Sequence, residues 1–134
     1  MRFFLFFLIV CIPGADLQSA CVCKLTELEE GRVESSKALV TKEADLQLPF
    51  RSAHLLHTMA KRGQSLCVFV SYKVDRSGTV SDVKIIRSNL PERILMRVVV
   101  AALNKFDHDD FFSDNVTLFY FFYYDLRKLG YGDG

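Results

Sequence analysis

Hydrophobic and polar residues alternate in two neighbouring stretches of the chain, and this pattern predicts the centre of the fold. In residues 65–74 every second side chain is apolar, namely Leu66, Val68, Val70, Tyr72 and Val74. Such spacing places one face of a β-strand in a core. A second alternating stretch, residues 79–87, follows a short polar connection that ends at Gly78, which is typical of a hairpin. Its apolar residues leave strict alternation near residues 81–82, which predicts a β-bulge there.

Apolar residues at helical spacing lie on both sides of this hairpin. Residues 49–62 begin with Pro49, which suits a first helical turn, and end before Gly63. A second helix is predicted over residues 91–105. It begins within the sequence Ser-Asn-Leu-Pro-Glu (residues 88–92), which supplies a cap and an acid for the first turn. The aromatic run in residues 115–126 predicts a third strand. We therefore expect an α+β fold, a small αββαβ domain with two helices on one face of a three-stranded antiparallel sheet.

The N-terminal residues have the pattern of an export signal. Arg2 precedes an apolar run over residues 3–12, and a Pro-Gly pair ends the run. A membrane-spanning helix needs about 20 apolar residues, whereas a run of this length is typical of a secretory signal peptide. We expect residues 1–20 to be removed after Ala20, so that the mature protein is periplasmic or secreted.

Cleavage there would leave three of the four cysteines, which cannot all pair within one chain. Cys21 is a lipidation candidate, because Ser-Ala-Cys resembles the end of a bacterial lipoprotein signal, and a lipid would tether the protein to a membrane. Cys23 and Cys67 are then the disulfide candidates, since exported proteins keep disulfides. Without lipidation, Cys21 and Cys23 compete for Cys67. An unpaired, buried Cys67 is the remaining alternative.

The rest of the chain gives weaker patterns. Residues 21–48 are polar and predict a variable lead-in segment, with a short strand, a partial helix or an extended linker as alternatives for residues 33–40. The tail from residue 128 ends in glycines, and we expect it to be loose. The predicted organisation is a signal peptide (1–20), a lead-in (21–48) and a folded domain (49–134).

Composition and motifs argue against several function classes. The 134 residues carry a net charge of +1 and no basic stripe, so we expect no nucleic-acid partner. The chain has no nucleophile motif and no phosphate-binding glycine loop, so we expect neither catalysis nor a cofactor. His54 and His57 lie three apart on the first predicted helix, and His108 lies in an acidic stretch. Positions on the surface of a helix explain His54 and His57 better than a metal site, so we predict no metal site.

The hairpin and the following helix resemble the C-terminal domain of TonB, the energy transducer of the Gram-negative envelope. The resemblance covers residues 49–126 and rests on one turn glycine among spaced apolar and small residues, namely Val70, Tyr72, Val74, Gly78, Val80, Val83, Ile85, Ser88, Ala101, Ala102 and Leu103. Residues 48–63 resemble the lead-in helix of that family. With only three prolines, the chain is a short stand-alone form without the family's long proline-rich spacer.

The resemblance implies a non-catalytic binding module for an envelope protein, such as a TonB-dependent outer-membrane receptor involved in transport. In that family the third strand pairs with an extended receptor segment, a mode that uses the free backbone groups of a sheet edge. The corresponding edge residues here are Asn115, Val116, Thr117, Leu118, Phe119 and Tyr120. The alternative is that the aromatic strand pairs with its own copy, which would give a homodimer, a self-associating envelope scaffold or a lipoprotein without a transport role.

Overall fold

The computed structural model describes residues 23–109 and 115–132. The predicted signal peptide and the lipidation candidate Cys21 lie outside these residues. In the described part of the chain, no helix combines the length and the apolar character needed to cross a bilayer.

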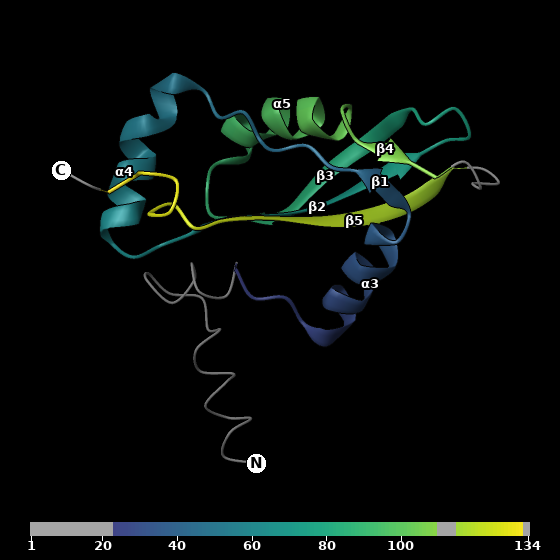
Figure 1. The fold of residues 1–134 in the computed structure, drawn as a ribbon, viewed down its shortest axis with the longest axis horizontal. Helices are drawn as coiled ribbons and strands as arrows, with labels where there is room; N and C mark the ends of the chain where they lie inside the picture. The colour runs from purple at the N-terminus through teal and green to yellow at the C-terminus, as the bar shows by residue number, and fades with distance from the viewer. Residues whose placement is uncertain (1–22, 110–114, 133–134) are drawn as a thin grey trace, which may run out of the picture.

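A three-stranded antiparallel sheet lies at the centre of the fold (Figure 1). Its strands are β2 (Leu66–Val74), β3 (Val80–Ser88) and β5 (Val116–Tyr124), in the order β3-β2-β5. β2 and β5 pair in one continuous register along their full length. The register of β2 with β3 shifts twice, and one shift coincides with the predicted bulge, where Asp82 has a φ of 50°.

Two helices pack against one face of this sheet, as predicted. They are α4 (Ala53–Lys61), which follows the short 3-10 helix η1 (Phe50–Ser52), and α5 (Glu92–Leu103). Alternate side chains of β2 and β5 meet apolar side chains of both helices in a single core. This inner face of β2 is completely buried at Leu66, Val68, Val70, Tyr72 and Val74. The α+β fold with two helices on one sheet face is therefore confirmed.

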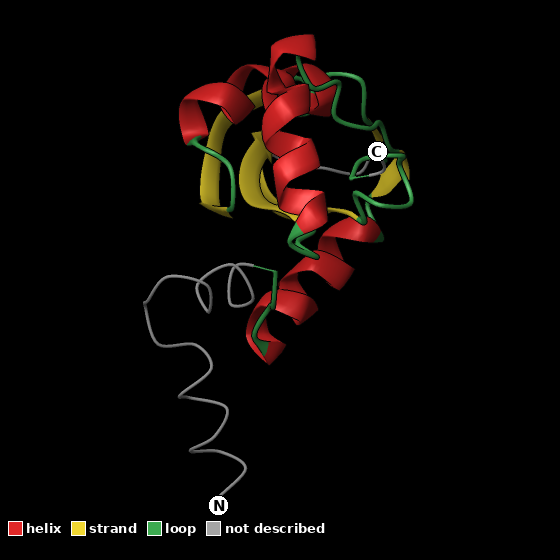
Figure 2. Cartoon of the chain, turned by 90° about the vertical axis from the view of Figure 1, so that its left-hand side faces the viewer, coloured by secondary structure: helices red, strands yellow, loops and turns green. Residues whose placement is uncertain are grey.

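A third helix, α3 (Glu27–Lys37), lies within the predicted lead-in and packs on the opposite side of the sheet (Figures 1 and 2). It begins with a capping box. Thr26 Oγ1 accepts a hydrogen bond from Glu29 N at 3.2 Å, and Glu29 Oε1 accepts one from Thr26 N at 3.0 Å. Such a box satisfies two otherwise unpaired donors at a helix start. The Thr-x-x-Glu spacing was readable in the sequence, and it would have predicted this helix.

The chain after α3 also belongs to the folded domain. The short strand β1 (Val40–Lys42) pairs with β4 (Asp107–His108) in a separate two-stranded sheet. The following residues contribute Leu46 to the core, and Leu46 N donates to Tyr124 Oη at 2.9 Å. The lead-in is thus bound to the domain at both of its ends.

The expectation of a loose C-terminal tail is wrong for residues 128–132. Gly132 N donates to His57 Nδ1 at 2.9 Å, and the ring of Tyr131 packs edge-on against the His57 ring. Gly132 has a φ of 88°, and a Cβ there would lie 2.9 Å from Ala60 Cβ. Gly132 therefore permits close packing on α4 rather than indicating a free tail.

Replacing Leu95, which is fully buried in α5, should test the importance of the core. Leu95→Ala should lower the free energy of unfolding by about 2–5 kcal/mol, because it removes buried methyl groups and leaves a cavity. Chemical denaturation measures the change. Leu129→Ala, at a side chain that is 57% exposed, is the control and should change stability by less than about 0.5 kcal/mol. Equal effects of the two substitutions would contradict the core described above.

Candidate functional site

β5 forms one edge of the sheet, and its backbone groups on that edge face away from β2. Phe119 N donates outward to Ser36 Oγ at 2.8 Å. Because the backbone groups of successive strand residues point to opposite sides, Thr117, Phe121 and Tyr123 also direct their N–H and C=O groups outward. Cys67 of β2 lies opposite Tyr123, and the backbone of Cys67 bonds to Asn89 on the β3 side. Cys67 and Tyr123 therefore do not bond to each other, which agrees with outward backbone groups at Tyr123.

The two edges of the sheet differ in how well they are protected. β3 is irregular, with two register shifts, and Asp82 and Lys84 place charges along it. Bulges and charges are common means of blocking strand addition. β5 has no register shift and no charged residue between its ends. β5 is therefore the edge that is chemically able to accept another strand.

A shallow groove of about 530 Å³ runs between α3 and the first half of β5. It is lined on the helix side by Leu28 and Arg32, among others, and on the strand side by residues 116–119. Leu28 is 66% exposed, so an apolar side chain borders the groove on its solvent side. Four of the six predicted edge residues, Val116 to Phe119, thus line a groove whose helix wall presents Leu28 and Leu39 together with Glu27, Arg32, Ser35 and Ser36. The side chains of Leu118 and Tyr120 turn into the core on the opposite face, so Thr117 and Phe119 are the edge residues whose side chains face α3, and Asn115 precedes the strand.

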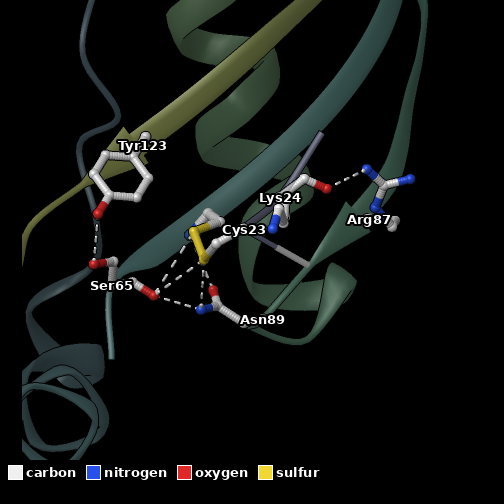
Figure 3. Close-up of a disulfide and its surroundings, with 7 residues drawn as sticks. Cys23, Lys24, Ser65, Arg87, Asn89 and Tyr123 are labelled. Atoms are coloured by element: carbon white, nitrogen blue, oxygen red, sulfur yellow. Dashed lines mark hydrogen bonds between the residues drawn. A yellow bond between two sulfur atoms is a disulfide. The ribbon is translucent and has the colours of Figure 1, made fainter. Parts of the chain in front are cut away.

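The helix wall of this groove is fixed to the sheet by a disulfide. Cys23 and Cys67 are bonded, with their Cα atoms 5.2 Å apart, which confirms the predicted pair. Figure 3 shows this disulfide beside Asn89 and Ser65. Cys67 lies on the sheet face opposite the α4–α5 core, as the alternation along β2 predicted. The bond therefore holds the start of the lead-in against the outer face of the central strand.

A partly buried ion pair between Glu29 and Arg87 provides a second attachment of α3 to the sheet. The guanidinium of Arg87 donates to both carboxylate oxygens of Glu29, each at 2.7 Å. The hydrogen bonds from Arg87 hold the pKa of Glu29 below its usual range. Arg87 also lies over the ring of Phe69, and Arg32 of α3 lies over the ring of Phe119, each at 5.3 Å from the ring centroid. These cation–π contacts cover the aromatic outer face of β2 and β5.

Asn89 closes the end of the sheet near the disulfide, a role that the sequence pattern did not indicate. Its Oδ1 accepts from Cys67 N at 3.1 Å, and its Nδ2 donates to Ser65 O. Ser65 Oγ in turn lies 3.0 Å from Tyr123 Oη. A side-chain amide that supplies one donor and one acceptor can extend a strand ladder by one step, but nothing in the local sequence distinguishes it from an ordinary turn asparagine.

The histidines do not come together. His54 is exposed on α4, His57 bonds to Gly132, and His108 Nε2 lies 3.0 Å from Tyr72 Oη. Burial raises the pKa of Tyr72 and lowers that of His108. Within residues 23–109 and 115–132, no group of three metal-ligating side chains is present.

Comparison of the chain with protein-family models and with curated proteins finds no match. Its function is therefore inferred from the β5 edge, the groove beside it and helix α3, which the disulfide holds near the sheet.

Removal of the disulfide should destabilise the protein. In a Cys21→Ser background, which prevents alternative pairing, Cys23→Ser should lower the free energy of unfolding by about 2–5 kcal/mol, because the unfolded chain loses its cross-link. Denaturation under oxidising conditions measures this. Cys21→Ser alone is the control and should match the wild type. A loss of stability in Cys21→Ser would instead show that Cys21 forms the bond.

The Glu29–Arg87 pair predicts a specific pH dependence. Because the folded-state pKa of Glu29 lies below its ordinary value of 4.5, the pair stabilises the fold above that value, and its contribution is lost as the pH falls through the folded-state pKa. Glu29→Gln should therefore lower stability near neutral pH and have a smaller effect at about pH 3. Urea unfolding at both pH values measures the difference. Glu30→Gln, at an exposed neighbouring position, should show no such change with pH.

Proposed function

We propose that this protein is a non-catalytic, exported binding module that pairs the outer edge of β5 with an extended segment of an envelope protein. The observation that carries this proposal is the edge itself, which is regular, has no charged residue within the strand, and is bordered by a groove with apolar side chains on both walls. An added strand would satisfy outward backbone groups and place alternate side chains into that groove.

Free-energy estimates indicate that contacts in the groove, rather than backbone hydrogen bonds, would select the partner. A backbone hydrogen bond contributes only about 0.5–1.5 kcal/mol net, and association itself costs at least about 4 kcal/mol. Pairing along the outward groups of Thr117, Phe121 and Tyr123 would roughly offset that cost. Contacts with Leu28 and the other groove residues would then supply the remaining affinity and select the partner sequence.

Ser36 introduces a local competition for the edge. Its hydroxyl already occupies the N–H of Phe119 and is itself buried, donating to Arg32 O at 2.8 Å. A visiting strand can pair at Phe119 only by displacing this hydroxyl. The exchange replaces one hydrogen bond with another, so it costs little net free energy while requiring a small shift of α3.

The resemblance to the TonB C-terminal domain supports a partner class. In that family the third strand of the sheet captures a short segment of an outer-membrane receptor, and β5 is the third strand of the central sheet here. We propose a periplasmic location and a TonB-dependent receptor segment as the partner.

Thr117→Pro should test the pairing mode. Proline removes the outward N–H of Thr117, whereas the pairing of β5 with β2 uses the neighbouring residues and should persist. Binding of a synthetic receptor-derived peptide should weaken by about tenfold or more. Fluorescence anisotropy measures the affinity, and hydrogen exchange should show protection at residues 115–120 on binding.

Thr117→Ala keeps the backbone donor and is the matched control, so it should bind like the wild type. Equal loss in both variants would indicate side-chain recognition rather than strand pairing. If no receptor-derived peptide protects residues 115–120, the proposal fails.

A second candidate is pairing of β5 with β5 of another copy. Its support is the exposed aromatic side chain of Tyr123, which is 53% exposed on an uncharged edge. Sedimentation over a range of concentrations distinguishes the two functions. Self-pairing predicts a dimer that Thr117→Pro dissociates, and a monomer at all concentrations would exclude it.

A further inference from the structure

A second groove lies on the helical side of the molecule and differs in chemistry from the β5 groove. It has a volume of about 1030 Å³ and lies between the η1–α4 segment and α5. Its lining consists of three arginines, four apolar residues and one serine, namely Arg51, Arg93, Arg97, Pro49, Leu55, Ile94, Val98 and Ser52. No acidic residue is part of this lining.

The three arginines carry uncompensated charge. Arg93 and Arg97 are four residues apart on α5, so they are neighbours on one face of the helix, where like charges destabilise it by a few tenths of a kcal/mol. Arg51 adds a third charge from η1. Within the described residues, none of the three forms an ion pair. Glu92 lies in the first turn of α5 but does not line the groove.

Apolar side chains lie directly beside these charges. Ile94 and Val98 are also four apart on α5, next to the arginine pair, with Ile94 partly exposed and Val98 9% exposed at the floor of the groove. Leu55 of α4 is 37% exposed on the facing wall. The groove therefore has a cationic part and an apolar part.

We propose that this groove binds a single-chain anionic amphiphile, with a phosphate head on the arginines and an alkyl chain on the apolar part. Guanidinium groups form strong charge-assisted hydrogen bonds with phosphate oxygens. The volume lies at the upper end of the range for small-molecule sites, which is enough for a medium-length chain. This site is independent of the β5 edge.

The walls of the groove favour an amphiphile over an acidic peptide. A peptide backbone needs hydrogen-bond partners, but Leu55, Arg97 and Val98 lie within α4 and α5, where the backbone groups are bonded within the helices. Ser52 is the single uncharged polar side chain in the lining, and it is itself only 6% exposed. An alkyl chain needs no such partners.

Calorimetry with dodecyl phosphate, below its micelle concentration, tests this proposal directly. Dodecyl phosphate should bind once per chain, and at least about tenfold more tightly than either inorganic phosphate or dodecyl maltoside. Inorganic phosphate measures the affinity for a head group without an alkyl chain, and dodecyl maltoside measures the affinity for the chain without a phosphate. Equal affinity for either probe would overturn the proposal, and so would tighter binding of an oligoglutamate peptide.

The variant Arg93→Gln/Arg97→Gln should weaken dodecyl phosphate binding by about tenfold or more. The matched control is Arg62→Gln/Lys105→Gln, which removes the same charge at exposed residues outside the lining. This control should change the affinity by less than about twofold. Equal weakening in both double variants would show that net charge alone attracts the probe, and would overturn the proposal. Circular dichroism checks that both variants remain folded.

Discussion

Burial of β2 on both of its faces is the constraint on which the rest of the structure depends. Its inner side chains are covered by α4 and α5, as amphipathic patterning requires. Its outer face holds Cys67 and Phe69, which are also almost completely buried. Two helices on one face cannot provide that cover. The fold therefore needs the N-terminal segment on the other face, where the disulfide, the Glu29–Arg87 ion pair and the contact of Arg32 with the ring of Phe119 hold it.

The same requirement explains which parts of the fold could be predicted from the sequence. The strands and the two inner helices have local signals, namely alternation, a turn glycine and helical spacing. The structure places them within one or two residues of the expected bounds, except that the first predicted helix begins as the 3-10 helix η1 and α4 starts only at Ala53. The position of α3 has no such signal, because its attachment depends on contacts with residues such as Arg87 that are distant in sequence. Its existence could have been predicted from the Thr26–Glu29 capping box, but its location could not.

The candidate site also has parts that could be predicted from the sequence and parts that could not. The resemblance to the TonB family implied the segment from Asn115 to Tyr120, and the cysteine count gave Cys23 and Cys67 as a candidate pair, with Cys21 as a competitor for Cys67. It did not indicate that Ser36 would occupy the N–H of Phe119, because that bond joins residues 83 positions apart. Nor did it indicate the arginine groove, which forms only when η1 and α5 lie side by side. Local pattern identifies a strand as suited to pairing, whereas tertiary packing decides how much of its edge remains open.

The disulfide also sets a geometric limit on any membrane attachment. An extended chain advances at most about 3.6 Å per residue. Only two peptide units separate Cys21 from Cys23, which the disulfide bonds to Cys67 in the sheet. If the lipid attached at Cys21, the anchor would lie within about 7 Å of the Cys23 Cα atom. The folded domain would then rest almost directly on the bilayer, and the range over which it could search for partners would be set by lateral diffusion rather than by the length of a linker.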